Sequence, residues 1–452
     1  MNIIIEGCGK TGYAIAKQMA DEGHEITMID ADPDNLQRAC LSLDVNGVEG
    51  NGTVVSVLTE AGVENCDVFV AVTKYDEVNL LSCLIAKKAA GHRLHTVAKV
   101  RNPEYYEEIS FLQEELDISL TFNPDDMTAN EIYLLLHTPN ALEIDTFAKG
   151  QMTMMTMKIP EGSALDQMSI ASMGSKFSNV LVCALERNKE VLIPDGQTVL
   201  QSGDIISVSL SVKDGYKFFE EVGLKTRPVK DVAIGGGDAM TYYLAKKLLA
   251  EGIHVTIVEP DFKTCENLSE SLDDAIVING DINDGDLLAE EGIMEKDAVI
   301  ALARYDEDNI VFSLFAGQNS KAKVITKINR SEFLDLFGEL PGAQVCPRNL
   351  ISEFVIRYVR SLENITGESN VNALYKLSGG RAEAMEFDIT EKSRVINTPL
   401  SELKLKNNLL ICNINRGNVN IRPSGSDELK PGDAVVVVTT HKGLHAIDDI
   451  LA

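Results

Sequence analysis

Residues 3–12 read Ile-Ile-Ile-Glu-Gly-Cys-Gly-Lys-Thr-Gly, an apolar segment that runs directly into a G-x-G-x-x-G motif. A strand that enters such a loop and continues as a helix is typical of the first β-α unit of a dinucleotide-binding fold. The first glycine permits the tight turn, the second lets backbone approach a pyrophosphate, and the third lets the helix pack on the strand. The phosphates then meet the free amides and positive dipole end of the helix.

Short apolar segments continue to alternate with helical ones after this motif. Strands are expected at residues 2–5, 25–29, 68–72 and 96–100, and helices at residues 12–20 and 76–90. This alternation is typical of βαβ units around a parallel sheet.

The second expected strand ends in an acid that bears on ligand choice. Asp30 follows Gly7 by 23 residues, near the spacing at which a carboxylate hydrogen-bonds an adenosine ribose and repels a 2′-phosphate. The residues therefore favour NAD or an adenine nucleotide over NADP.

The whole pattern occurs twice. Residues 3–9 recur at 232–237, so that Gly235 aligns with Gly7, and residues 71–79 recur at 301–309. Such self-similarity at a fixed period indicates a duplicated structural unit. We therefore expect a tandem duplication in which each copy is about half of the chain.

Each half divides again into two parts that differ in their predicted secondary structure. A proline-containing cap at residues 123–126 predicts a helix that runs to about Leu136, and the sequence beyond Pro139 becomes strand and turn. We expect an α/β fold with two doubly wound Rossmann-like nucleotide-binding domains, each followed by a small β-rich α+β domain. The predicted domains are residues 1–138, 139–224, 229–365 and 366–452, with residues 225–228 as the linker between halves.

The glycine loop of the second copy differs from the first. In the alignment above, Asp238 stands where Lys10 stands, Met240 replaces the third glycine, and Glu259 retains the ribose position of Asp30. An acid at a helix N-terminus itself satisfies the amides there. The second copy either binds a nucleotide differently and more weakly, or it is a structural repeat without ligand.

Composition and motifs exclude several classes of function. A net charge of −28 repels nucleic-acid backbones, so we expect no nucleic-acid partner. The eight cysteines lack the spacing of a zinc site, and the segment before Gly9 lacks the earlier glycine of a Walker motif, Ile4 standing there instead. We also find no signal peptide and no apolar run long enough to cross a membrane, which predicts a cytoplasmic protein.

The seven histidines offer no catalytic constellation beside the predicted nucleotide site. The residues therefore favour a nucleotide sensor over an enzyme. An NAD-dependent oxidoreductase with an unrecognised substrate domain remains the alternative, and a structural scaffold with relic sites is a third possibility.

The chain as a whole resembles the regulator-of-potassium-conductance (RCK) family. The carrying features are the glycine motif, Asp30, the Gly-Asn-Gly at residues 50–52, the segments at residues 71–79 and 98–101, and the order of domains twice over. This resemblance implies a gating subunit that binds NAD(H) or ATP/ADP. It also implies a membrane potassium-translocating partner of the TrkH or TrkG kind, which would hold the subunit at the inner face of the membrane.

The resemblance also implies the site residues and the assembly. The implied first-site residues are Gly7, Cys8, Gly9, Lys10, Thr11, Gly12, Asp30, Asn51, Gly52, Thr73, Lys74 and Lys99. The implied second-site residues are Gly235, Gly236, Gly237, Asp238, Ala239, Glu259, Asp281, Ala303, Arg304 and Lys327. No catalytic residue and no metal ligand is implied.

Members of this family assemble their nucleotide domains into a ring of eight, which a two-copy chain would complete as a homo-tetramer. The helix near residues 125–136 and its counterpart near 349–359 are expected to cross between neighbouring nucleotide domains. The apolar residues expected in that interface are Ile132, Leu135 and Leu136 in the first helix and Leu350, Phe354 and Val355 in the second.

Overall fold

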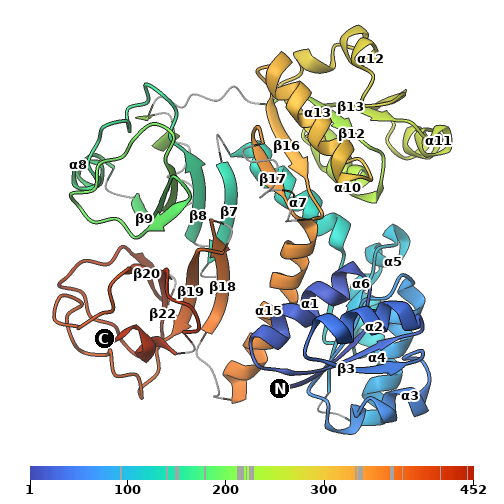
Figure 1. Ribbon diagram of the computed structural model, residues 1–452, viewed down its shortest axis with the longest axis horizontal. Coiled ribbons are helices and arrows are strands. Elements are labelled where there is room, and N and C mark those ends of the chain that lie inside the picture. The colour runs from blue at the N-terminus through green and yellow to red at the C-terminus, as the bar shows by residue number, and fades with distance from the viewer. Residues whose placement is uncertain are drawn as a thin grey trace.

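The computed structural model describes residues 1–91, 94–138, 141–147, 152–177, 180–210, 218–219, 221–222, 229–330, 333, 340–366, 371–378, 380–417, 419–444 and 446–452. The predicted linker at residues 225–228 lies outside these ranges. Figure 1 shows the described chain as two α/β units and two β-rich units. Within the described ranges, no helix combines the length and apolar character that crossing a bilayer requires.

The first α/β unit contains a six-stranded sheet of order β3-β2-β1-β4-β5-β6, in which every neighbouring pair is parallel. Its strands are β1 (Asn2–Glu6), β2 (Glu25–Asp30), β3 (Asn46–Glu49), β4 (Val68–Ala71), β5 (His95–Lys99) and β6 (Leu120–Phe122). Its helices are α1 (Lys10–Asp21), α2 (Pro33–Ser42), α3 (Val55–Glu60), α4 (Asp76–Ala90), α5 (Pro103–Glu107), α6 (Ile109–Glu115) and α7 (Pro124–His137). This strand order is that of a doubly wound dinucleotide-binding sheet.

The second α/β unit repeats this topology with the order β14-β13-β12-β15-β16-β17. Its strands are β12 (Asp231–Gly235), β13 (His254–Glu259), β14 (Ile276–Asn279), β15 (Ala298–Ala301), β16 (Lys323–Lys327) and β17 (Ala343–Val345). Its helices are α10 (Ala239–Ala250), α11 (Phe262–Ser271), α12 (Gly285–Glu290), α13 (Asp306–Asn319) and α15 (Pro347–Thr366).

Each β-rich unit is a five-stranded antiparallel sheet. The first contains β7 (Ala141–Phe147), β8 (Met152–Lys158), α8 (Ile170–Lys176), β9 (Leu181–Arg187), β10 (Glu190–Leu192) and β11 (Ile205–Leu210). The second contains β18 (Val371–Leu377), β19 (Ala382–Asp388), β20 (Leu409–Arg416), β21 (Val419–Ile421) and β22 (Asp433–Thr439). One buried cluster, which includes Phe147, Cys183, Tyr375 and Cys412, joins the two sheets. The predicted fold class is confirmed.

Helix α7 leaves the first unit and packs on the second. Asn123 caps it by accepting hydrogen bonds from the amides of Asp125 and Asp126, as the predicted helix start required. Its apolar face lies against α10 in one cluster with Leu244 and Leu248, so the predicted interface role of Ile132, Leu135 and Leu136 is confirmed.

Helix α15 makes the reciprocal crossing. It leaves the second unit and runs beside α1 of the first, as Figure 1 shows. Val355 is buried among the first unit's core residues and Phe354 packs against them, as predicted. Leu350 was expected in this interface as well, but it lines a cavity between the units because it lies nearer the start of the helix. Each α/β core is thus completed by a helix from the other half.

Candidate nucleotide-binding sites

The glycine loop of the first unit folds as its sequence predicts. Gly7 has φ +105°, and a Cβ there would lie 3.0 Å from the amide nitrogen of Thr73. A Cβ on Gly12 would lie 1.8 Å from the carbonyl oxygen of Gly7. The turn at Gly7 and the contact at Gly12 therefore both require glycine.

The N-terminus of α1 is left open by this loop. Gly9 occupies the N-cap position and carries no capping side chain, and its missing Cβ would meet nothing within 4 Å. The first turn of a helix has no internal partner for its amides. The amides that follow Gly9 therefore face outward beside exposed Lys10 and half-buried Thr11 as ready anion donors.

Asp30 points back at the loop rather than into solvent. Its Oδ2 accepts a hydrogen bond from the amide of Cys8 at 2.5 Å, and its Oδ1 accepts one from the amide of Asp32 at 2.8 Å. A carboxylate has about four lone-pair positions, so acceptor capacity remains for ribose hydroxyls. Asp30 therefore orients the loop and retains the chemistry of a ribose acceptor.

The other implied first-site residues follow the carboxyl ends of neighbouring strands. Because β1 to β5 are parallel, Asn51, Gly52, Thr73, Lys74 and Lys99 lie at the same edge of the sheet as the glycine loop. This is the edge at which doubly wound sheets bind ligands.

Lys99 is a buried cation at this edge. Its Nζ donates to the carbonyl oxygen of Val72 at 3.1 Å, and the side chain forms no ion pair with another described residue. Burial, followed by the nearby charge of Arg101, lowers the pKa of Lys99 to about 8. An anion bound nearby would favour its charged form.

Two residues that the sequence analysis missed hold the edge together. Asn79 accepts a hydrogen bond from the amide of Thr73 at 2.8 Å and donates one to the carbonyl oxygen of Lys99 at 2.9 Å. Asn309 donates in the same way to Ala303 and Lys327 in the second unit. Their recurrence in the repeated Tyr-Asp-Glu-x-Asn segments was the signal available in the sequence.

Glu6 is a third residue that the sequence analysis missed. It ends β1, it is 3% exposed, and its Oε1 accepts a hydrogen bond from the amide of Gly52 at 2.8 Å. A Cβ on Gly52 would lie 2.5 Å from Cδ of Glu6, so the size of one residue restricts the other. Burial raises the pKa of Glu6. A charged residue directly after the apolar run of residues 3–5 was its signal.

The structure corrects the alignment of the second glycine loop by one residue. Asp238 occupies the N-cap position of α10, which Gly9 occupies in α1, so it stands at the position of Gly9 and not of Lys10. Gly236, with φ +110°, corresponds to Gly7, and Ala239 corresponds to Lys10. The shift arises because β12 continues through Gly235, which corresponds to Glu6 in β1.

The third glycine is consequently replaced by Thr241 and not by Met240. The hydroxyl of Thr241 donates to the carbonyl oxygen of Gly236 at 2.8 Å. Met240 instead packs in the core beside Leu244. The second loop thus holds a side chain at the point where the first loop has no room for one.

Asp238 also closes the phosphate position of the second unit. Its Oδ1 accepts from the amides of Met240 and Thr241 at 3.1 and 3.3 Å, and its Oδ2 pairs with Lys327 at 3.1 Å. Lys327 is the counterpart of Lys99. The helix amides and the buried lysine that remain available in the first unit are therefore both engaged by one carboxylate in the second.

The remaining second-site residues lie where the topology places them. Glu259 accepts hydrogen bonds from the amides of Gly237 and Asp261 at 2.7 and 2.8 Å, as Asp30 does from its own loop. Asp281 follows β14, and Ala303 and Arg304 follow β15 at the same edge. The ribose position is therefore kept while the phosphate position is occupied by protein.

Both domain types of this chain match known protein families. The TrkA-N domain family matches residues 3–124 and 232–346, and the TrkA-C domain family matches residues 154–223 and 384–452. The Trk system potassium uptake protein TrkA homolog of Archaeoglobus fulgidus is 31% identical over 454 residues, covering 100% of both chains.

Two solved structures share the fold. The RCK domain of GsuK has a TM-score of 0.64 at 15% identity and covers 97% of this chain and 92% of that chain. The GsuK channel bound to NAD has a TM-score of 0.64 at 14% identity, covering 97% and 76%. With both domain types matched in tandem and the full length aligned to a relative, the chain belongs to the TrkA family of Trk system potassium uptake proteins.

Proposed function

We propose that the chain is a nucleotide-sensing regulatory subunit of a potassium uptake system, with its main sensing site at the glycine loop of the first α/β unit. The observation that carries this proposal is the uncapped N-terminus of α1 at Gly9, with Asp30 beside it. In this proposal residues 1–138 and 229–365 are the nucleotide-binding domains, and residues 139–224 and 366–452 are the β-rich domains that accompany them.

NAD(H) and ATP/ADP are the proposed ligands of the first site. An open helix end, a close-packed glycine loop and buried Lys99 together favour a pyrophosphate or polyphosphate chain. Asp30 favours an unmodified ribose. The NAD-bound state of the structurally similar GsuK channel is consistent with this ligand class.

The second site is proposed mainly to stabilise the fold rather than to bind a nucleotide. The carboxylate of Asp238 accepts hydrogen bonds from the helix amides and forms an ion pair with Lys327. A phosphate chain would therefore have to displace this carboxylate before it could contact the amides or the lysine. Two like charges at short range in a partly hydrated site cost roughly a few kcal/mol. We therefore expect the second site to bind NADH or ATP far more weakly than the first.

Regulation rather than catalysis is proposed because relatives over the full length are Trk potassium uptake proteins. An NAD-dependent oxidoreductase is the competing function. The two differ in turnover: with NADH and a panel of carbonyl substrates, a sensor binds NADH stoichiometrically and leaves its absorbance unchanged, whereas an oxidoreductase consumes it.

The proposed assembly is a homo-tetramer that arranges eight α/β units in a ring on the cytoplasmic side of a potassium-translocating membrane subunit. The N-cap residues of α4 and α13, Tyr75 and Tyr305, are each 59% exposed. Within these helices the equivalent residues Leu81 and Val311 are 47% and 54% exposed. Repeated apolar patches of this kind suit contact with further copies of the chain. The net charge of −28 suits docking on basic cytoplasmic loops.

The test of nucleotide sensing is the affinity of Asp30→Ala for NADH, measured by calorimetry on the full-length chain. Loss of a charged hydrogen-bond acceptor is expected to cost about 1–3 kcal/mol of binding free energy. Glu259→Ala is the matched control, because it removes the equivalent carboxylate from the second site. Wild-type affinity in Asp30→Ala, or an equal loss in Glu259→Ala, would contradict the proposal.

A further inference from the structure

A side chain of the second half contacts the first candidate nucleotide-binding site. Tyr243 of α10 reaches the segment that follows β5, where its hydroxyl donates a hydrogen bond to the carbonyl oxygen of Arg101 at 3.4 Å. The same hydroxyl accepts a hydrogen bond from the side-chain amide of Asn123 at 3.0 Å, and this amide also donates to the Arg101 carbonyl oxygen at 3.3 Å. Three groups thus meet at one point, and one of them comes from the other half.

The segment that Tyr243 contacts carries a residue of the first site. It begins directly after Lys99, whose carbonyl oxygen accepts a hydrogen bond from Asn79 at 2.9 Å. The amide of Arg101 donates to the carboxylate of Asp76 at 2.8 Å. Helix α4 therefore holds the beginning of this turn, and Tyr243 holds its carbonyl side from the second half.

The contact has no equivalent at the second site. Tyr243 is the fifth residue of α10, whereas the fifth residue of α1 is Ala14, which has no hydroxyl. Asn123 directly precedes α7, whereas Cys346 directly precedes α15. Both side chains of the bridge therefore differ between the two copies, and the bridge belongs to the site whose helix amides are open.

Sheet topology determines which part of a ligand this segment would meet. Asp30 ends β2 on one side of β1, and Lys99 ends β5 on the other side, three strand positions away. Neighbouring strands lie about 4.8 Å apart, so the two strand ends are separated by roughly 14 Å. A dinucleotide lies across the switch point of such a sheet. With its adenosine at Asp30, the half of NADH beyond the pyrophosphate would extend toward the segment that Tyr243 holds.

The hydroxyl of Tyr243 can be removed without removing the side chain that carries it. The ring packs edge-on against Tyr106 and Tyr242, with centroid distances of 6.4 and 5.5 Å. Burial raises the pKa of Tyr243 to about 12, so the hydroxyl keeps its proton and can donate at neutral pH. Phenylalanine at this position would keep the ring contacts and lose only the hydrogen bonds.

We propose, on the basis of the proposed function, that Tyr243 is a positioning residue of the first nucleotide-binding site and that it makes this site selective for a dinucleotide over a mononucleotide. The hydroxyl fixes the turn after β5 where the second half of NADH would lie. The glycine loop and Asp30 lie on the other side of the site and do not depend on it. Affinity for NADH therefore depends on a group supplied by the second half, and affinity for AMP does not.

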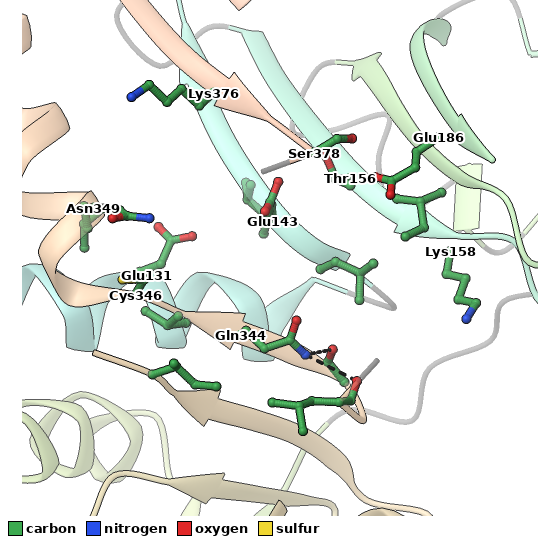
Figure 2. A pocket seen from close by; sticks show the side chains of 18 of the residues that line it. Glu131, Glu143, Thr156, Lys158, Glu186, Gln344, Cys346, Asn349, Lys376 and Ser378 are labelled. Carbon is green, nitrogen blue, oxygen red and sulfur yellow. Dashed lines mark hydrogen bonds between the residues drawn. The ribbon is translucent and has the colours of Figure 1, made fainter. Parts of the chain in front are cut away.

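The bridge is separate from the cavity of about 970 Å³ that lies between the halves. Arg101, Asn123 and Tyr243 are not among the residues that line this cavity. Figure 2 shows that Glu131 extends into it from α7, about two turns beyond Asn123. A substitution of Glu131 therefore perturbs the contact between the halves without touching the bridge.

The test is calorimetry on the full-length chain, with NADH titrated directly and AMP measured by competition with NADH. Tyr243→Phe is expected to bind NADH about three- to tenfold more weakly, as for the loss of one or two hydrogen bonds, and AMP within about twofold of the wild type. Tyr242→Phe is the matched control, because its hydroxyl contacts Lys246 at 3.5 Å and its counterpart in α1 is also a tyrosine, Tyr13. Glu131→Gln is the second control, and both controls should bind both ligands as the wild type does.

The comparison of NADH with AMP separates positioning from a general loss of structure, which would weaken both ligands. Wild-type NADH affinity in Tyr243→Phe would overturn the proposal, and so would an equal loss for NADH and AMP or an equal loss of NADH affinity in either control. Absence of NADH binding in the wild type would overturn the proposed function together with this inference. NADH binding that Tyr243→Phe leaves unchanged would overturn this inference alone.

Discussion

Glu6 and Gly52 are a large and a small residue in contact in the first half. In the second half the small residue stands at the first of these positions and the large one at the second. In the first half a large buried acid lies under a residue without a side chain. In the second half the counterpart of Glu6 is Gly235, and a Cβ there would lie 2.9 Å from Ile282, which takes the place of Gly52. Both halves thus fill one space beneath the loop after β3 or β14, the first with a polar group and the second with an apolar one.

This pairing predicts a coupling that a double-mutant cycle measures. Gly52→Ala places a methyl group 2.5 Å from Cδ of Glu6 and should lower the free energy of unfolding by about 1–3 kcal/mol. In the background of Glu6→Ala the same change should cost much less, because the space is then vacant. Urea denaturation followed by circular dichroism measures both; an equal cost in the two backgrounds would refute the contact.

Most residues at the sheet edge were predictable because strand ends, glycine motifs and acids have strong local signals. The positions of Gly7, Asp30 and Thr73 follow from a parallel sheet once the strands are known. The register of the second loop was not predictable in this way. Three consecutive glycines allow several alignments, and the capping of α10 by Asp238 together with the positive φ of Gly236 fixes the correct one.

The crossover helices are the elements that join the two halves. The sequence predicted the extent of α7 well, since Asn123 and Pro124 mark its start. The surface on which α7 packs could not be predicted from the hydrophobic periodicity of the helix, because an apolar face can pack on any complementary surface. Family resemblance supplied the expectation of crossing, and the packing of α7 on α10 and of α15 on α1 identifies the surfaces.

Adjacent leucines of α7 provide a matched test of this packing. Leu135 is 1% exposed in the interface with the second unit, whereas Leu134 is 42% exposed. Leu135→Ala should lower the free energy of unfolding by about 2–5 kcal/mol, as for a buried leucine. Leu134→Ala should change it by no more than about 0.5 kcal/mol. Equal effects in urea denaturation would contradict the assignment of the interface.

At the scale of the whole molecule, the exchange of helices makes the two halves interdependent. Separation near residue 225 would expose the apolar faces that α7 and α15 now cover, so nucleotide binding has to be measured on the full-length chain. The duplication and the order of domains were predictable from the repeated sequence. The cavity between the halves was not, because it depends on how four units pack.

The proposed tetrameric ring predicts the molar mass of the protein in solution. Light scattering at micromolar concentration should give about four times the 49.3 kDa of one chain. Charge placed in the exposed patches, as in Leu81→Glu combined with Val311→Glu, should reduce this mass. Leu41→Glu, at a position that is 80% exposed on α2, should leave it unchanged. A monomeric wild type would refute the assembly.

The most direct test of the central claim transfers the capping acid of the second site into the first. Gly9→Asp has space for its side chain and should occupy the amides of α1 as Asp238 occupies those of α10, whereas Gly9→Ala adds only a methyl group. Calorimetry with NADH should give one tight site per wild-type chain, unchanged by Gly9→Ala and weakened by about 2 kcal/mol or more, near 30-fold, by Gly9→Asp. Two equal sites in the wild type, or wild-type affinity in Gly9→Asp, would contradict the account.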